Sequence, residues 1–223
     1  VNGGSFFVSA GANADGTVLN SGHQYISGTD KNSTVNGGIQ EIRSGGVASG
    51  TVIKDGTQQI NEGGRAENTI ASGSALLDVF GSINGASVAD DATLIIAGNG
   101  HADGTRLTGG TMEINDDASS ANTIVSGGTQ YVYGTETGST VSGGRQNVES
   151  GGKVLNAVLS GNGIQTIYNG GTAQKRGSST AAFRKLKTAD SRNKHSSAKT
   201  AFSKSTTAAP HKKTPLKTAA FRT

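Results

Sequence analysis

A phrase of the form Gly-x-Gln-x-(Ile or Val) recurs through the first 173 residues and constrains the fold more than any other feature. Six copies are strict: GHQYI at 22–26, GIQEI at 38–42, GTQQI at 56–60, GTQYV at 128–132, GRQNV at 144–148 and GIQTI at 163–167. Looser copies close at Val8, Val79, Ile96 and Ile114, so the closing apolar residue returns every 16 to 19 positions. A fixed period of this length indicates a solenoid, in which each unit buries its apolar residues only by stacking on its neighbours.

A second phrase, typically (Gly, Ser or Asn)-Thr-(Val or Ile), follows the first in most units. We interpret its branched residues as one inward slot: Val18, Val35, Val52, Ile70, Val88, Ile124, Val141 and Val158. Arg106 interrupts this series. Because a buried, unpaired arginine is costly, we expect a local shift that turns Leu107 or Thr105 inward instead.

Both phrases are typical of short β-strands, because Thr and branched residues alternate within them and Gly, Asn, Asp and Ser separate them. The 35 glycines argue against helix, and a hydrophobic content of 32% argues against an ordinary close-packed globule. We therefore predict an all-β fold, a single-stranded right-handed parallel β-helix (β-solenoid) of about nine rungs over residues 1–173. The two anchors of a unit lie roughly 10 and 8 residues apart, which disfavours a left-handed coil with an apolar residue at every sixth position.

The glutamines of the first phrase share one slot of the repeat. A polar ladder along an outer face is the interpretation we adopt for these residues, with a buried row of amides as the alternative. The candidate exposed ladder consists of Gln24, Gln40, Gln58, Gln130, Gln146 and Gln165.

Charge divides the chain in two. Residues 1–173 contain seven Lys and Arg against fifteen Asp and Glu, whereas residues 174–223 contain thirteen against one. The net charge of +4 is therefore the sum of −8 in the repeats and +12 in the C-terminal segment, and the repeats give no reason to expect a specific nucleic-acid partner. Residues 174–223 are predicted to be a disordered basic tail, since Lys, Ala, Ser and Thr dominate without an apolar period.

The stretch GIQEIRSGGVASGTVIKDGTQQINEGGRAENTI at 38–70 resembles the passenger-domain repeats of self-associating autotransporter adhesins of the AIDA and antigen-43 types. The resemblance covers residues 1–173. It implies a β-helix displayed on the outer membrane of a Gram-negative bacterium as part of a longer precursor. Its partners would be like passenger domains on neighbouring cells, leading to autoaggregation and biofilm formation, and host-surface glycans or proteins. The chain shows neither a signal peptide nor translocator strands, so we expect a fragment of such a precursor.

Some members of this family are glycosylated on Ser or Thr in their turns, which implies a glycosyltransferase as a further partner. The serines that precede Gly-Gly match those positions, although simple turn chemistry also accounts for each of them. These candidates are Ser44, Ser126, Ser142 and Ser150.

A β-helical polysaccharide-degrading enzyme is the rival interpretation, and a passive spacer stalk is a third. The paired carboxylates are Asp90-Asp91 and Asp116-Asp117, which occupy positions where other units have Gly-Gly or Asn-Gly. Glycoside chemistry needs two carboxyls converging on one sugar, so we interpret both pairs as turn residues. GTDKNST and GNGHADGT lack the Asp-x-Asp-x-Asp spacing of a dedicated cation loop. We expect no enzyme activity, no catalytic residues, no metal and no cofactor.

One feature of the tail does not fit a disordered electrostatic segment. TAAFR occurs at 180–184 and again at 218–222, and Phe183, Phe202 and Phe221 are 19 residues apart. Thr-Ala-Ala-Phe-Arg can be encoded so that a frame starting one base earlier reads Asn-Gly-Gly-Ile-Gln, the phrase found at 36–40. We therefore hypothesise that the tail is repeat DNA read out of frame after about residue 174. The alternative is a genuine basic segment for nucleic acid or anionic surfaces.

Overall fold

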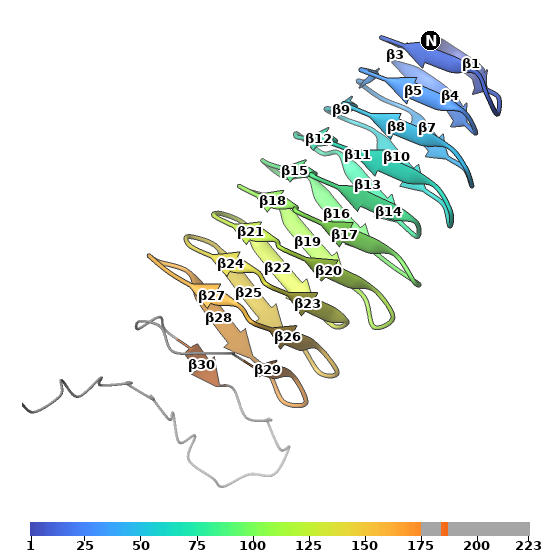
Figure 1. Ribbon diagram of the computed structural model, residues 1–223. Helices are drawn as coiled ribbons and strands as arrows, with labels where there is room; N and C mark the ends of the chain where they lie inside the picture. Colours follow the sequence, from blue (N-terminus) through green and yellow to red (C-terminus); the bar gives the residue numbers. More distant parts are fainter. Residues whose placement is uncertain (175–183, 187–223) are drawn as a thin grey trace, which may run out of the picture.

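In the computed structural model the chain forms a rod in which three parallel β-sheets wind around one interior (Figure 1). The structure describes residues 1–174 and the backbone of residues 184–186. Each of the first nine rungs contributes one strand to each sheet, so that the first rung contains β1 (Asn2–Val8), β2 (Asn13–Asp15) and β3 (Val18–Leu19). The tenth rung contributes a strand to the first and second sheets. About ten turns stack in this way, which confirms the predicted all-β solenoid and adds a turn to the expected nine.

The first sheet runs the length of the rod and has the longest strands. Its strands, in spatial order, are β1 (Asn2–Val8), β4 (Ser21–Ile26), β7 (Ile39–Ile42), β10 (Thr57–Ile60), β13 (Leu76–Val79), β16 (Thr93–Ile96), β19 (Thr111–Ile114), β22 (Thr129–Val132), β25 (Arg145–Val148), β28 (Ile164–Ile167) and β30 (Arg184–Leu186). The closing apolar residue of every first phrase points inward here. These residues, from Val8 to Ile167, are at most 3% exposed, as predicted.

The second sheet follows a turn of two or four residues. Its strands are β2 (Asn13–Asp15), β5 (Thr29–Lys31), β8 (Val47–Ser49), β11 (Arg65–Glu67), β14 (Ser82–Asn84), β17 (His101–Asp103), β20 (Ser119–Ala121), β23 (Thr135–Thr137), β26 (Lys153–Leu155) and β29 (Thr172–Gln174). Only the middle residue of each strand points inward. It is Ala in half of the rungs.

The third sheet is the narrowest, with two residues in each strand. Its strands are β3 (Val18–Leu19), β6 (Thr34–Val35), β9 (Val52–Ile53), β12 (Ile70–Ala71), β15 (Ser87–Val88), β18 (Arg106–Leu107), β21 (Ile124–Val125), β24 (Thr140–Val141) and β27 (Val158–Leu159). In most rungs the strands of the three sheets therefore have four, three and two residues. A left-handed coil with an apolar residue at every sixth position would have three sides of equal length.

The corner between the second and third sheets has two residues, and the first of them has a positive φ angle in each of the first nine rungs. That residue is Gly or Asn, the two types that adopt this conformation at little cost. The angles lie between 53° and 75°, and the residues are Gly16, Asn32, Gly50, Asn68, Gly85, Gly104, Asn122, Gly138 and Asn156.

The second anchor series was wrong in its register. The strand pairing places Val18 beside Thr34 and Leu19 beside Val35, so the branched residues of the second phrase alternate between two neighbouring positions. Val35, Val88 and Val141 are buried, whereas Val18, Ile70, Ile124 and Val158 are 38–50% exposed. The inward slot therefore contains Leu19, Ile53, Ala71, Leu107 and Val125 in those other rungs.

Arg106 is consequently no exception and causes no local shift. It pairs with Ser87 and Ile124 in the outward position, while Leu107 pairs inward with Val88 and Val125. Leu107 and Thr105 are both buried, as expected. The cause is the geometry that every rung shares, and not a local shift at Arg106.

The tail predictions lie largely outside the described residues. Gln174 ends β29, and the short strand β30 adds to the first sheet with Arg184 beside Gln165. The expected disorder and the out-of-frame origin of residues 175–183 and 187–223 concern residues that the structure does not describe. The described residues contain no helix long and apolar enough to cross a membrane.

Candidate interaction surface

The glutamines lie inside the rod, which corrects the predicted exposed ladder. They do stack in a column along the rod, because the strand register pairs Gln24 with Gln40, Gln40 with Gln58, and Gln130 with Gln146. Each side chain is at most 3% exposed; the residues are Gln24, Gln40, Gln58, Gln130, Gln146 and Gln165. In a strand, residues two apart share a face, and each glutamine is two residues before a buried Ile or Val. That spacing places the amides on the core side.

The four glycosylation candidates fall on two different edges. Ser44 and Ser150 lie in four-residue turns between the first and second sheets, and both are exposed. Ser126 and Ser142 follow the third sheet. The hydroxyl of Ser126 donates a hydrogen bond of 3.3 Å to the carbonyl of Leu107. Ser126 is exposed like Ser44 and Ser150, but its hydroxyl is engaged in that hydrogen bond, and Ser142 is half-buried.

The two aspartate pairs also lie on different edges of the rod. Asp90-Asp91 forms the turn after β15, whereas Asp116-Asp117 forms the turn after β19, and Asp90 adopts a φ of 53°. Both pairs are turn residues, as predicted, and they do not converge on one site. Among residues 1–174, no three His, Asp or Glu side chains group closely enough to suggest a metal site.

One edge of the rod collects the aromatic residues. We call it the aromatic edge and define it as the outward side of the first sheet together with the first residue of the turn that follows each strand. All four tyrosines of the chain lie there: Tyr25, Tyr131, Tyr133 and Tyr168. Phe7 and Phe80 occupy equivalent positions and are 60% and 39% exposed. The repeat pattern did not single out this edge, although Tyr131 and Tyr133 flank the inward Val132 and could have marked it.

The N-terminal part of the aromatic edge contains a stacked group. The rings of Phe7 and Tyr25 are 4.9 Å apart and nearly parallel, and the ring of His23 lies 5.8 Å from that of Tyr25. The guanidinium of Arg43 lies 4.2 Å from the centre of the Tyr25 ring, within the range of a cation–π contact.

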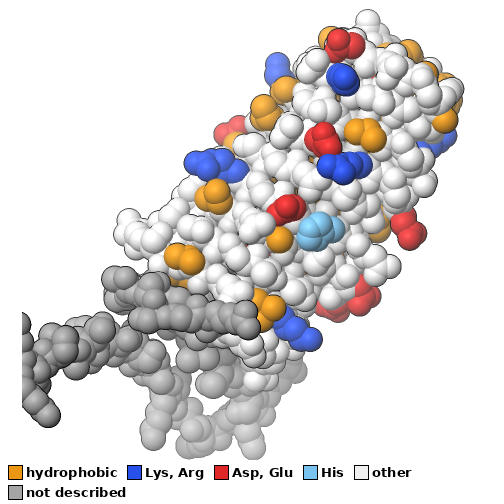
Figure 2. Space-filling view, viewed as in Figure 1, with side chains coloured by type: hydrophobic (Ala, Val, Ile, Leu, Met, Phe, Trp, Pro, Cys, Tyr) orange, Lys and Arg blue, Asp and Glu red, His pale blue; other side chains and the backbone are white. Residues whose placement is uncertain are grey.

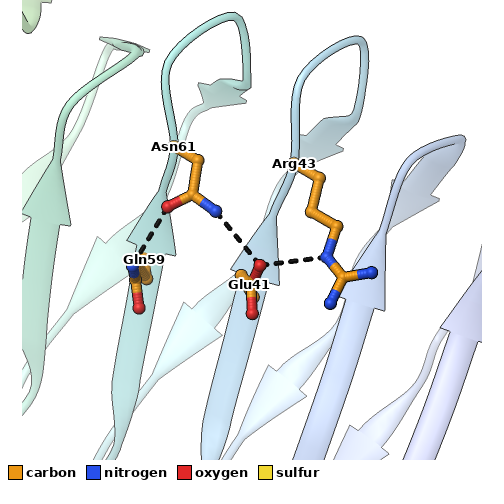
Figure 3. Close-up of polar contacts among 4 residues, drawn as sticks. All are labelled: Glu41, Arg43, Gln59 and Asn61. Atoms are coloured by element: carbon orange, nitrogen blue, oxygen red, sulfur yellow. Dashed lines mark hydrogen bonds and ion pairs between the residues drawn. The ribbon is translucent and has the colours of Figure 1, made fainter.

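A polar network continues this group across two rungs (Figure 3). Arg43 donates through Nε to Glu41 at 2.9 Å, and Asn61 donates to the same carboxylate oxygen at 3.1 Å. Gln59 in turn donates to Asn61 at 3.0 Å. Exposed pairs of this kind contribute little to stability. They fix the directions of four side chains on an outer face, which is useful for recognition.

The turns along the aromatic edge differ in length. The turn after the first-sheet strand has four residues in most rungs but two in rungs 2, 5 and 8, where it is Ser27-Gly28, Phe80-Gly81 and Tyr133-Gly134. The glycine is required, because a Cβ on Gly134 would lie 2.2 Å from the carbonyl oxygen of Asn115 in the turn of the previous rung. Longer turns thus flank each short one.

One recess extends over rungs 6 to 8 of this edge and is acidic and aromatic. Its lining consists of Gly98, Glu113, Asn115, Asp116, Asp117 and Tyr133. Partial burial, followed by the nearby charge of Glu149 and Glu113, raises the pKa of Tyr133, and partial burial raises the pKa of Glu149. On the face shown in Figure 2, charged and hydrophobic side chains are dispersed over a mainly polar surface.

Comparison with known proteins gives one informative likeness. No family profile and no curated protein matches the chain. A solved structure, the "TibC-catalyzed hyper-glycosylated TibA55-350 fragment", superposes with a TM-score of 0.70 and 28% sequence identity. The match covers 85% of this chain and 80% of that fragment. TibA is an autotransporter adhesin of the AIDA type, and its fragment belongs to the passenger domain.

Proposed function

Since the chain carries β-helical passenger repeats of the AIDA-type autotransporter adhesins and forms an adhesin-like rod, we propose that it mediates self-association of bacteria and binding to host surfaces. The rod would stand on the surface of a Gram-negative cell. Like rods on neighbouring cells and host-surface glycans or proteins would be its partners, and we propose no catalytic role for it.

The gathering of all four tyrosines on one edge is the observation that carries this proposal. Tyrosine and arginine are enriched at the centres of interfaces, because an aromatic ring buries a large area and its polar tip still finds a partner. The rod repeats such groups along its length, so many weak contacts can add up to avidity.

Cells that display the full-length parent should autoaggregate, and sedimentation of a cell suspension measures this. Tyr25→Thr, Tyr131→Thr and Tyr133→Ser should together slow sedimentation by tenfold or more, on the order expected from losing more than 1.4 kcal/mol of contact energy. Thr166 and Ser27 occupy equivalent positions in other rungs, so these replacements fit the fold.

The matched control changes apolar residues on the third sheet. Ile70→Thr and Ile124→Thr remove exposed side chains at positions where Thr34 and Thr140 occur in other rungs, and aggregation should be unchanged. If the tyrosine variants aggregate like the parent, the aromatic edge is not the adhesive surface.

Two rival functions make different predictions. Deleting residues 76–128 removes rungs 5–7 and joins Ala75 to Thr129, which begins the equivalent strand. Full aggregation by both this variant and the tyrosine variants would favour a passive spacer stalk. Depolymerisation of pectin or a similar polyanion by the purified rod, with dispersed cells, would favour an enzyme.

We also propose a glycosyltransferase as a partner, acting on Ser44 and Ser150 ahead of Ser126 and Ser142. The hydrogen bond of the Ser126 hydroxyl and the partial burial of Ser142 support this order, and the TibC-catalysed glycosylation of the similar TibA fragment supports the transferase. Co-expression with such a transferase, followed by mass spectrometry of tryptic peptides, tests it. Glycan confined to Ser126 and Ser142 would contradict the order.

A further inference from the structure

The C-terminal row of buried glutamines runs in one direction and ends on a carboxylate. Gln165 donates its amide to Gln146 at 2.7 Å, and Gln146 donates to Gln130 at 2.8 Å. Gln130 then donates to Oε2 of Glu136 at 2.7 Å. Gln165 and Gln146 therefore donate toward the N-terminal end of the rod, and Gln130 completes the row by donating within its own rung.

The N-terminal row repeats this arrangement. Gln58 donates to Gln40 at 2.7 Å, Gln40 donates to Gln24 at 2.9 Å, and Gln24 donates to Oδ1 of Asp30 at 2.9 Å. Gln40 also donates to Oδ2 of Asp30 at 3.0 Å. Both rows thus terminate on a carboxylate from the second sheet.

A terminal acceptor is needed because the glutamine column is interrupted. Between the two rows the same slot contains Leu77, Leu94 and Met112. Without Glu136, the side-chain amide of Gln130 would face only the sulfur of Met112 at 3.7 Å, and a thioether sulfur is a weak acceptor. Glu136 supplies the oxygen that this amide lacks, since a buried donor without a partner is costly.

Glu136 is itself poorly satisfied. Its side chain is 0% exposed, and Oε2 accepts from Ser120, from Thr123 at 3.0 Å and from Gln130. Oε1 has no hydrogen-bond partner among the described residues. Burial raises the pKa of this carboxyl group.

No charged group offsets the burial of Glu136 within the described part of the chain. The elements packed against it contribute Ser120 from β20, Thr123 from the corner, Gln130 from β22 and Val154 from β26. Its strand neighbours are Thr135 and Thr137. Burial also raises the pKa of Asp30, but both of its carboxylate oxygens accept amide hydrogens, and Asp15 is its charged neighbour.

We propose that Glu136 is a proton-binding terminator of the glutamine row, which holds rungs 7–9 closed while it is protonated and lets them loosen when it ionises. A proton on Oε1 removes the buried negative charge and leaves Oε2 to accept the three hydrogen bonds. The rod is therefore an acid-stabilised structure with its pH-sensitive point in the C-terminal half. This device is independent of how the outer surface binds its partners.

The sign of the pH dependence follows from the raised pKa of Glu136 in the folded rod. Its stabilising contribution is fully present below the pKa of glutamate in the unfolded chain. It is lost progressively as the pH rises from there through the folded pKa. Because rungs contact only their neighbours, the loosening is local.

Hydrogen exchange of the full chain tests this proposal. After correction for the intrinsic exchange rate, protection of amides in residues 119–141 should fall about tenfold per pH unit above the ordinary glutamate pKa, and level off once Glu136 ionises in the folded rod. Protection of residues 83–102, which lie within rungs 5 and 6, should fall much less, because the carboxyl with a raised pKa beside them, that of Asp78, is only half-buried.

Glu136→Gln keeps the shape of the protonated acid and should abolish the pH-dependent fall in amide protection in residues 119–141. Glu62→Gln, an exposed control in the turn after β10, should leave it unchanged. Should Glu136→Gln fail to fold, Glu136→Ala places in this slot the residue of most other rungs and should also abolish the pH dependence. An identical fall in wild type and in whichever variant folds, or an equal fall in residues 83–102, would overturn the proposal.

Discussion

The hydroxyl of Thr69 donates a hydrogen bond of 3.0 Å to the side-chain carbonyl of Gln58 inside the rod, where both residues are fully buried. Gln58 thereby connects the first sheet to the corner of its own rung, and its amide connects it to Gln40 in the previous rung.

Replacing Gln58 by Leu should lower the free energy of unfolding. Leucine has a similar size and occurs in this column at Leu77, so the loss reports on hydrogen bonds rather than on a cavity. Thr69 would lose its acceptor, and we expect a cost of about 1–3 kcal/mol. Denaturant unfolding followed by circular dichroism measures it. The neighbouring outward residue provides the control, since Gln59→Ala should change stability by less than about 0.5 kcal/mol.

The third sheet allows a test of its two-position register. Arg106→Val should leave stability nearly unchanged, because Val18 and Val158 occupy the equivalent outward position. Leu107→Ala should cost about 2–5 kcal/mol, since it opens a cavity in the core. Thermal unfolding of both variants distinguishes them. Equal costs would contradict the register of β18, in which Arg106 faces outward and Leu107 inward.

The corner glycines give a prediction about backbone conformation. Gly138 has a φ of 75°, and Asn occupies the same corner at Asn122 with a φ of 55°. Gly138→Asn should therefore be tolerated, whereas Gly138→Val should cost about 1–3 kcal/mol, because a branched side chain disfavours positive φ. The comparison of their thermal midpoints is the measurement. A valine variant as stable as the asparagine variant would argue against this corner geometry.

The nucleotide sequence tests the origin of the tail. In the structure the backbone of Arg184 pairs with Gln165, 19 residues earlier. If the frame that starts one base earlier is read, the codons of Phe183 and Arg184 should supply a glutamine at this register position, followed by further Gly-Gly repeats. Restoring that frame should extend the solenoid and its β signal in circular dichroism. Stop codons in that frame would instead make the tail a genuine basic segment.

The sequence predicted the solenoid because its period is repeated ten times, and the closing Ile and Val residues left little choice of core side. The glutamines were wrongly predicted to face outward, because their polarity was given more weight than the alternation of side chains along a strand. Gln24 and Ile26 are two residues apart and therefore share the inward face. The Val18 series failed for a related reason. In strands of two residues, Val18 and Leu19 are both apolar, and only the pairing with Thr34 and Val35 decides which one is inside. The buried partners of the amides, Asp30 and Glu136, could not be found by period alone, because they occur in only two rungs.

The two-residue turns after the first-sheet strands are evenly spaced along the rod. They recur at every third rung, and with ~4.8 Å between rungs the interval is ~14 Å. A partner whose own groups repeat at that interval would meet each of these turns in the same way, whereas any other spacing would drift out of phase within a few steps. Lengthening the rod by whole three-rung units would make that match of spacing more exacting.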